Sequence, residues 1–220
     1  KPSSAASDVY KRQAVLNMPF SEEIPTLTPV GITRWKGEEW ITQRALDTAN
    51  FTVEKDALTL CGNDLDLCDR KMQGLLLVRQ QERAFTAETA LEIPAAGTAG
   101  LTCYYDEHSY LKFGIGPEGL LLEEYAGYEV VSMQTAPLPA STSHVRLRVM
   151  ATDGQRHFAI QDGTDWHTLW SIPEPRYLTS EGLQCGKRFT GAMVGLYVHG
   201  ASAVRFADWV AVWPHPEEKR

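Results

Sequence analysis

Acidic side chains are the first candidates for chemistry, because two carboxyl groups at a fixed separation can hydrolyse a glycosidic bond. The separation is about 5–5.5 Å for a retaining mechanism and about 6.5–9.5 Å for an inverting one. An E-x-D-x-x-E pattern, which places carboxylates on one face of a strand, does not occur in the sequence. Glu123, Glu124 and Glu129 come closest, but their spacing and the intervening Gly127 do not fit. The sequence predicts no catalytic residues, and it also lacks a G-x-S-x-G serine nucleophile signature.

A metal site has one candidate ligand, Asp208, near the last predicted strand. Its carboxylate, together with backbone carbonyls of an N-terminal strand, would suit Ca²⁺, which prefers oxygen ligands. A second acidic cluster, Asn63, Asp64, Asp66 and Asp69, lacks the spacing of an EF-hand and is expected to be a solvated loop. No cofactor is required by these patterns, and a structural Ca²⁺ is the one metal they suggest.

The four cysteines do not form a zinc site, because there is no C-x-x-C pair and no histidine at zinc-finger spacing. Cys103 lies inside a strand pattern and is expected to be a buried thiol. Cys61 and Cys68 flank the acidic loop and could bridge in an exported protein. Free thiols are the expectation, because the composition is not that of a small disulfide scaffold.

Aromatic and polar side chains could bind a sugar, whose apolar ring face packs on aromatic rings while its hydroxyls form hydrogen bonds. Strand alternation puts Tyr104 on the opposite face from Cys103 and Tyr105. Arg79 and Glu88 are expected on neighbouring strands of the same outer sheet. The candidate ligand-binding patch therefore comprises Arg79, Glu88, Tyr104 and Tyr110. The alternative interpretation is a structural ion pair with packed tyrosines.

The elements that must position these residues are strands. Short apolar or alternating runs recur between Gly, Pro, Asp and Asn, and helical periodicity is nearly absent, which is typical of an all-β sandwich. The predicted strands are Trp40–Arg44, Phe51–Glu54, Ala57–Cys61, Gly74–Gln81, Phe85–Ile93, Gly100–Asp106, Tyr110–Ile115, Leu120–Tyr125, Glu129–Gln134, Val145–Thr152, His157–Gln161, Trp166–Leu169, Ala192–Val198 and Phe206–Trp213. The expected fold is an antiparallel two-sheet jelly roll.

Charge and length limit the partners and the number of domains. A formal net charge of −7 disfavours nucleic acid and anionic membranes as partners, whereas a neutral polysaccharide remains acceptable.

Residues 8–13, DVYKRQ, match the translation of a common sequencing adapter, so residues 1–13 are interpreted as a non-native leader. The expected organisation is this leader, a linker segment at 14–32, one β-sandwich domain at 33–214 and a charged tail at 215–220. A further domain is expected upstream.

Several motifs in a fixed order resemble one known domain. They are LTLCG (Leu58 to Gly62), VRQQ (Val78 to Gln81), FTAET (Phe85 to Thr89), AGLTCYYD (Ala99 to Asp106), DGTDW (Asp162 to Trp166), FTGAMVGLY (Phe189 to Tyr197) and FADW (Phe206 to Trp209). The series resembles the C-terminal concanavalin A-like β-sandwich of bacterial glycoside hydrolase family 43 β-xylosidases, also classed as carbohydrate-binding module family 91.

The resemblance implies an accessory domain that packs on a five-bladed catalytic propeller and is associated with xylan. In the family, a loop before the VRQQ-like strand directs an aromatic residue toward the propeller's pocket. Here the corresponding stretch, residues 67–73, reads LCDRKMQ without an aromatic, and Lys71 or Met72 would take that place. This departure disfavours a pocket-closing role and strict β-xylosidase specificity, so an arabinofuranosidase or another family 43 activity stays open.

Three functions follow from the sequence. The first is a non-catalytic domain that binds xylan or xylo-oligosaccharides beside its propeller. The second is a purely structural domain that shapes the propeller without sugar affinity. The third is an autonomous glycan-active hydrolase. An exposed aromatic row would favour the first, an exposed apolar patch the second, and a close carboxylate pair in a cleft the third.

Overall fold

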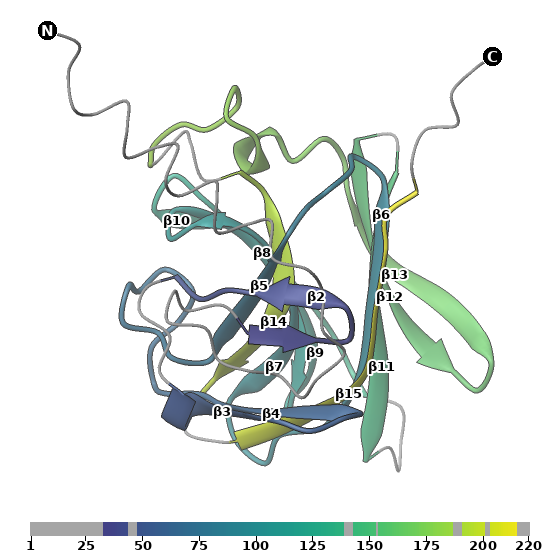
Figure 1. Ribbon diagram of the computed structural model, residues 1–220. Coiled ribbons are helices and arrows are strands. Elements are labelled where there is room, and N and C mark those ends of the chain that lie inside the picture. Colours follow the sequence, from purple (N-terminus) through teal and green to yellow (C-terminus); the bar gives the residue numbers. More distant parts are fainter. Residues whose placement is uncertain are drawn as a thin grey trace, which may run out of the picture.

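The computed structural model describes residues 33–43, 48–138, 143–152, 154–186, 191–200 and 203–214. These residues form two large antiparallel sheets packed face to face (Figure 1). The predicted all-β jelly-roll sandwich is therefore confirmed. The expected leader and linker, residues 1–32, and the charged tail, residues 215–220, lie outside the described residues.

The six-stranded sheet carries the strands that matter most for the candidate site. Its order is β10 (Glu129–Ala136), β9 (Gly119–Ala126), β8 (Ser109–Gly116), β7 (Thr98–Asp106), β14 (Met193–His199) and β5 (Leu75–Arg79). The seven-stranded sheet has the order β13 (Asp165–Ile172), β12 (Gln155–Asp162), β11 (His144–Thr152), β6 (Phe85–Glu92), β15 (Ala203–Val212), β4 (Ala57–Cys61) and β3 (Phe51–Val53).

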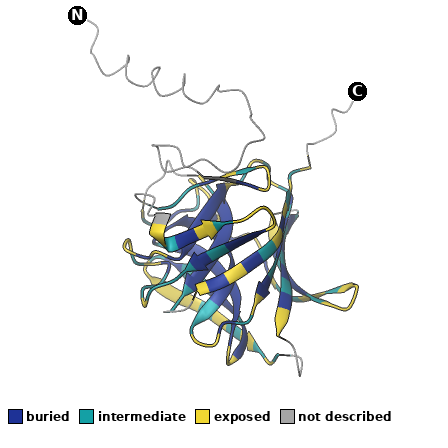
Figure 2. Ribbon diagram, turned by 60° about the horizontal axis from the view of Figure 1, so that its bottom comes forward, coloured by how far each residue is buried: buried dark blue, intermediate teal, exposed yellow. Residues whose placement is uncertain are grey.

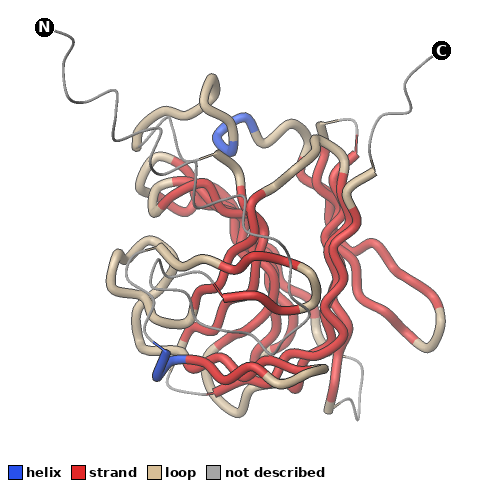
Figure 3. Tube along the Cα trace, viewed as in Figure 1, coloured by secondary structure: helices blue, strands red, loops and turns tan. Residues whose placement is uncertain are grey.

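Helical structure is limited to two short 3₁₀ turns, η1 (Thr48–Asn50) and η2 (Arg176–Leu178), among the described residues (Figure 3). A separate hairpin pairs β1 (Thr33–Trp35) with β2 (Glu38–Trp40). In the part of the chain described here, no helix has the length and apolar character needed to cross a bilayer.

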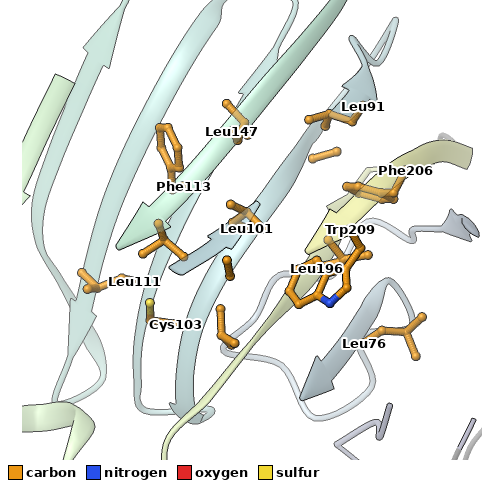
Figure 4. Close-up of a cluster of buried hydrophobic side chains, with 14 of the residues drawn as sticks. Leu76, Leu91, Leu101, Cys103, Leu111, Phe113, Leu147, Leu196, Phe206 and Trp209 are labelled. Atoms are coloured by element: carbon orange, nitrogen blue, oxygen red, sulfur yellow. The ribbon is translucent and has the colours of Figure 1, made fainter. Parts of the chain in front are cut away.

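The main core lies between the two sheets, as alternation predicts. Val145, Leu147 and Val149 of β11 point inward and pack with Leu101 and Phe113 of the opposite sheet (Figure 4). Figure 2 shows the resulting pattern, with buried residues along the interior of the sandwich. Burial of such side chains is the main stabilising contribution to a two-layer fold of this kind.

A β-bulge in β15 decides which aromatic residue enters the core. The register with β6 shifts between Ala207 and Val210, and Asp208 occupies the bulge with a φ of 51°. The extra residue turns Trp209 inward, where its ring packs edge-on against Trp40 with a centroid separation of 4.7 Å. The same bulge leaves Asp208 exposed to solvent.

Candidate functional site

The structure separates two residues of the predicted ligand-binding patch. Arg79 ends β5 in the six-stranded sheet, whereas Glu88 lies on β6 in the seven-stranded sheet. The expectation that they share one outer sheet is wrong, because the chain crosses from one layer to the other in the turn between β5 and β6. Glu88 instead accepts a hydrogen bond of 2.8 Å from Arg148 Nε and lies 3.8 Å from Arg146 Nη2. This ion-pair cluster belongs to the outer face of the seven-stranded sheet.

The two predicted tyrosines do lie together on the outer face of the six-stranded sheet. Tyr104 of β7, Tyr110 of β8 and Tyr125 of β9 form a stacked row, with ring centroids 6.2 Å and then 4.7 Å apart. Tyr104 is 2% exposed and Tyr110 is 1% exposed. They are therefore not the open aromatic platform that sequence alternation suggested, because a loop covers them.

That covering loop runs over residues 63–73, and Leu67 and Met72 contribute its apolar contacts with the tyrosines. Met72 is buried in this second apolar cluster, whereas Lys71 is exposed. The family resemblance places Lys71 or Met72 where related domains carry a pocket-facing aromatic residue. Of these two, only Lys71 is thus available to contact another domain. Gln43 ties the loop to the row, since its Nε2 donates to the Tyr104 hydroxyl and, at 3.3 Å, to the Leu67 carbonyl.

A buried lysine anchors the same loop from below. Lys112 of β8 is 3% exposed, and its Nζ lies 2.5 Å from Asp66 Oδ2 and 3.4 Å from His199 Nδ1. Asp66 Oδ1 also accepts a hydrogen bond of 2.7 Å from the Leu67 amide. The expected solvated acidic loop is therefore partly wrong, because Asp66 is a structural partner of the sheet.

Glu123 and Tyr110 add a second buried polar pair to this face. The Tyr110 hydroxyl donates to Glu123 Oε1 at 3.2 Å. Burial, together with the nearby carboxylates of Asp66 and Glu123, raises the pKa of Tyr110 far above its ordinary value. Tyr110 is therefore a neutral hydrogen-bond donor at any physiological pH.

An open pocket of about 170 Å³ adjoins the tyrosine row. We call it the sheet-face pocket, and its lining includes Gln43, Arg79, Tyr104, Asp106, Glu107 and Met193. Leu77, Tyr104 and Met193 are buried and apolar in character, whereas Arg79 is exposed. The sheet-face pocket thus combines an apolar floor with charged groups around it.

Glu107 is a charged residue of the sheet-face pocket that is held by neighbouring cationic side chains. Its Oε1 lies 2.6 Å from Arg70 Nε and 3.9 Å from His108 Nε2. Burial alone would raise the pKa of the Glu107 carboxyl, but a backbone hydrogen bond and the Arg70 guanidinium more than offset this, so the pKa lies below its ordinary value. Glu107 therefore presents a fixed negative charge at neutral pH.

Asp208 has no cluster of metal ligands around it. It stands exposed in the β15 bulge, and no group of three or more His, Cys, Asp or Glu side chains suited to a metal occurs within the described ranges. The four cysteines are all free, as expected. Cys103 is buried, and desolvation raises the pKa of its thiol.

Sequence reasoning missed Lys112 and the Arg70–Glu107 pair. Lys112 alternates with Leu111 and Phe113, so its position on the outer face was readable. The burial of Lys112 could not be predicted from the sequence, because it depends on a loop some forty residues earlier in the chain. The contact of Lys112 with Asp66 in that loop spans 46 residues. Trp166 lies on the outer face of the seven-stranded sheet, with the Arg148 guanidinium 3.7 Å from its ring centroid.

Exposed apolar side chains gather on strand β10, the edge of the six-stranded sheet, and on the turn residue that precedes it. We call this set the β10 strip; it comprises Tyr128 (62% exposed), Val130 (49%), Val131 (56%) and Met133 (58%). Tyr128 is the one aromatic residue among the large exposed apolar side chains that the structure describes. An exposed aromatic row is thus not present in this part of the chain, whereas an exposed apolar patch is.

Comparison with known sequences decides the family. The profile of the β-xylosidase C-terminal concanavalin A-like domain matches residues 36–210. The chain belongs to this family. The resemblance inferred from the ordered motifs is thereby confirmed. No curated protein sequence matched the chain.

Solved structures agree with membership of the concanavalin A-like domain family. A xylan β-1,4-xylosidase from Bacillus halodurans matches with a TM-score of 0.69 at 20% identity, over 89% of this chain and 41% of that one. A family 43 protein of a xyloglucan utilisation locus from Bacteroides ovatus matches with a TM-score of 0.67 at 21% identity, over 89% and 41%. At these identities the likeness establishes the fold.

The share of the relative's length that this concanavalin A-like domain covers differs from one solved structure to another. A family 43 protein from Bacillus licheniformis matches with a TM-score of 0.63 at 23% identity, over 78% of this chain and 40% of that one. The chain thus spans about 40% of the length of these family 43 proteins. A functionally unknown protein from Saccharomyces cerevisiae, by contrast, is covered over 96% of its length, with a TM-score of 0.56 at 16% identity.

Proposed function

We propose that this chain is a non-catalytic accessory domain of a family 43 glycosidase and that its sheet-face pocket binds xylan or xylo-oligosaccharides. Membership of the β-xylosidase C-terminal domain family supports the accessory role. The choice of polysaccharide rests on the name of one structural relative, a xylan β-1,4-xylosidase. The partner domain in this proposal is the five-bladed catalytic propeller.

The observation that carries the binding proposal is the composition of the sheet-face pocket. Its apolar floor of Leu77, Tyr104 and Met193 can accept the ring face of a sugar, while Arg79 and Glu107 can donate to and accept from hydroxyls. Its volume of about 170 Å³ is below the roughly 300–1,000 Å³ of pockets for drug-sized ligands, so we assign it a single sugar unit at a chain end or side branch.

A pull-down on insoluble xylan, cellulose and arabinan tests this proposal, with reducing-sugar release measured in the same tubes. Selective retention on xylan without sugar release is the expected result. Arg79→Ala should reduce retention at least several-fold, because it removes the exposed guanidinium of the sheet-face pocket. Glu88→Gln, in the opposite sheet, is the matched control and should bind as the unmodified chain does. Equal retention of both variants would reject the sheet-face pocket as the xylan site.

A purely structural role is the second candidate function, and the β10 strip favours it. An apolar patch on an otherwise charged surface is typical of a docking site for another domain. Absence of retention on every polymer would favour this role over sugar binding. Sugar release would instead revive an autonomous hydrolase, which the structure does not favour, because Glu123 and Glu124 are consecutive on β9 and point to opposite faces.

A further inference from the structure

A second and larger pocket lies at one end of the sandwich. We call it the end pocket, and its volume is about 520 Å³. The turn after β5, the start of β12 and the segment around η2 enclose it; η2 is the upper of the two helical turns in Figure 3. This volume is within the range of about 300–1,000 Å³ that is typical of small-molecule sites.

A buried arginine faces the end pocket. Arg156 of β12 is 8% exposed and is paired in register with Ala151 and Ile172, which both belong to the main core, so its side chain points between the sheets. Its Nη2 donates to Gln80 Oε1 and its Nη1 to the Gln155 carbonyl, both at 3.3 Å, while its buried Nε has no hydrogen-bond partner.

No carboxylate compensates this buried charge. Among the described residues, the ion pairs within 4.0 Å involve other cations and leave Arg156 without an acidic partner. The guanidinium instead lies 5.3 Å from the centroid of the Phe85 ring, which offers only a weak compensating interaction. Buried charges in proteins are normally paired, because an isolated one costs several kcal/mol of desolvation. An anionic ligand would supply the missing partner.

The remaining lining adds positive charge and hydroxyl partners. Arg83 and Arg176 line the end pocket with Arg156, against the two acidic residues Glu174 and Glu181. Glu174 is itself bound to Arg176, at 3.1 Å. The end pocket is thus net positive in a chain whose formal net charge is −7. Thr179 and Ser180 add hydroxyl groups to the lining.

We propose that the end pocket binds a uronic acid, the carboxylate of which pairs with Arg156. A single carboxylate matches the one unpaired buried guanidinium, because Arg binds carboxylates through two parallel hydrogen bonds. The sugar hydroxyls would bond to Ser180 and Gln80, contacts that an inorganic anion would not make, whereas the Thr179 hydroxyl is already bonded to the Arg176 carbonyl and the Gly182 amide. This site adjoins the sheet-face pocket, since Tyr105 lines both, but it does not depend on xylan binding there.

Titration with free D-glucuronate tests the proposal, with glucose as the matched neutral ligand and inorganic phosphate as a bare anion. Calorimetry should detect binding of glucuronate to the unmodified chain and none of glucose. The affinity should weaken as salt is added, because charge pairing contributes to it. Arg156→Gln should weaken glucuronate binding roughly 10- to 100-fold, as expected for the loss of a charged hydrogen-bond pair.

Arg83→Gln removes an exposed lining charge and should weaken glucuronate binding a few-fold even if Arg156→Gln fails to fold. Arg146→Gln, on the outer face of the seven-stranded sheet, is the control and should bind normally. Arg79→Ala should also bind glucuronate normally, which distinguishes a failure of the end pocket from a failure of the sheet-face pocket. Lack of glucuronate binding to the unmodified chain, or binding of phosphate in its place, would overturn the proposal.

Discussion

Lys112 illustrates how a single charged residue can organise a surface loop. Its ammonium group is held in the middle of a sheet face by Asp66 and by the ring of His199. A buried lysine without a partner is costly, so the loop that carries Asp66 and the sheet that carries Lys112 stabilise each other. This contact helps to hold the loop over the tyrosine row.

Removing the lysine should loosen the loop while leaving the sandwich folded. We expect Lys112→Ala to lower the free energy of unfolding by about 2 kcal/mol, less than for a fully buried pair because the Asp66 side chain is 23% exposed. Limited proteolysis should then cut within residues 63–73 much faster than in the unmodified chain. Unchanged protection of this loop would show that its apolar contacts hold it without the ion pair.

Glu107 should make the protein sensitive to acid. Because the folded-state pKa of its carboxyl lies below the unfolded value of about 4.3, its stabilisation is complete above that value and is lost as the pH falls through the folded pKa. Urea unfolding between pH 3 and pH 7 should show a smaller loss of stability toward acid in Glu107→Gln than in the unmodified chain. Parallel curves for the two proteins would contradict this assignment.

Asp208 offers a test of the calcium site suggested by the sequence. Its φ of 51° is a left-handed conformation that glycine adopts with less strain, so Asp208→Gly should be neutral or stabilising by up to about 1 kcal/mol if the residue holds no metal. Thermal melting with added Ca²⁺ or with a chelator separates the two cases. A melting temperature that falls with the chelator only in the unmodified chain would support a Ca²⁺ bound by Asp208.

At the scale of elements, close contacts across the six-stranded sheet depend on small residues. Gly100 of β7 and Gly114 of β8 are direct partners in register, and Tyr197 of β14 lies beside them on the same face. A Cβ atom at residue 114 would overlap the Tyr197 hydroxyl and the Ala99 carbonyl. Gly114 therefore leaves the space that the Tyr197 hydroxyl occupies, whereas Gly100 allows the close approach of the β8 backbone.

Gly114→Ala should consequently destabilise the sheet, because either Tyr197 or the backbone of β7 must move. We expect a loss of about 1–3 kcal/mol, as is usual for an added methyl group in a packed region. Differential scanning calorimetry would measure the change. Gly163→Ala, in an open turn where the new methyl meets no atom within 4 Å, is a useful comparison that reports backbone strain without overlap.

The strands themselves were largely predictable from the sequence. The predicted runs at Phe85–Ile93, Gly100–Asp106 and Val145–Thr152 correspond to β6, β7 and β11 within two residues at each end. Alternation is local, so it identifies strands and their two faces. The predicted run Trp40–Arg44 was wrong over residues 40–43, because β2 ends at Trp40 and of the next three residues only Ile41 makes an isolated bridge, to Leu77. Arg44 lies outside the described residues.

The assignment of strands to sheets could not be predicted in the same way. Arg79 and Glu88 are nine positions apart, and nothing local indicates that the intervening turn crosses between layers. Burial of the predicted tyrosines likewise depends on the loop that carries Leu67 and Met72. The outward direction of Tyr104 on β7 was predicted correctly, because alternation along a strand is local. The placement of Glu88 in the same sheet as Arg79 was wrong, because the assignment of strands to sheets depends on contacts between distant parts of the chain.

At the scale of the whole molecule, the β10 strip is an unprotected edge of the six-stranded sheet, unlike the edge strands of most sandwiches. An edge strand normally carries charges or proline that prevent pairing with other chains. Strand β10 reads EVVSMQTA and has a single charge, Glu129. Such an edge is suited to permanent coverage by another domain.

Charges placed on the β10 strip should affect docking and little else. We expect Val131→Lys with Met133→Lys to change the free energy of unfolding by no more than about 0.5 kcal/mol, because both side chains are exposed. Sedimentation of the chain mixed with a family 43 catalytic propeller should show complex formation that the double variant loses. Val210→Lys with Val212→Lys, exposed on the other sheet, is the control pair. Equal association of both double variants would place the interface elsewhere.

The positions of β14 and β15 have a consequence for how the protein is made. These two successive strands enter the interiors of different sheets, β14 between β7 and β5 and β15 between β6 and β4. One of the resulting contacts, from Thr89 Oγ1 to the Ala207 carbonyl, spans 118 residues. During synthesis each layer therefore stays divided, with open edges, until β14 and β15 have left the ribosome. Folding dominated by such long-range pairing is slow and prone to aggregation, so the nascent domain is exposed to aggregation until β14 and β15 have joined their sheets.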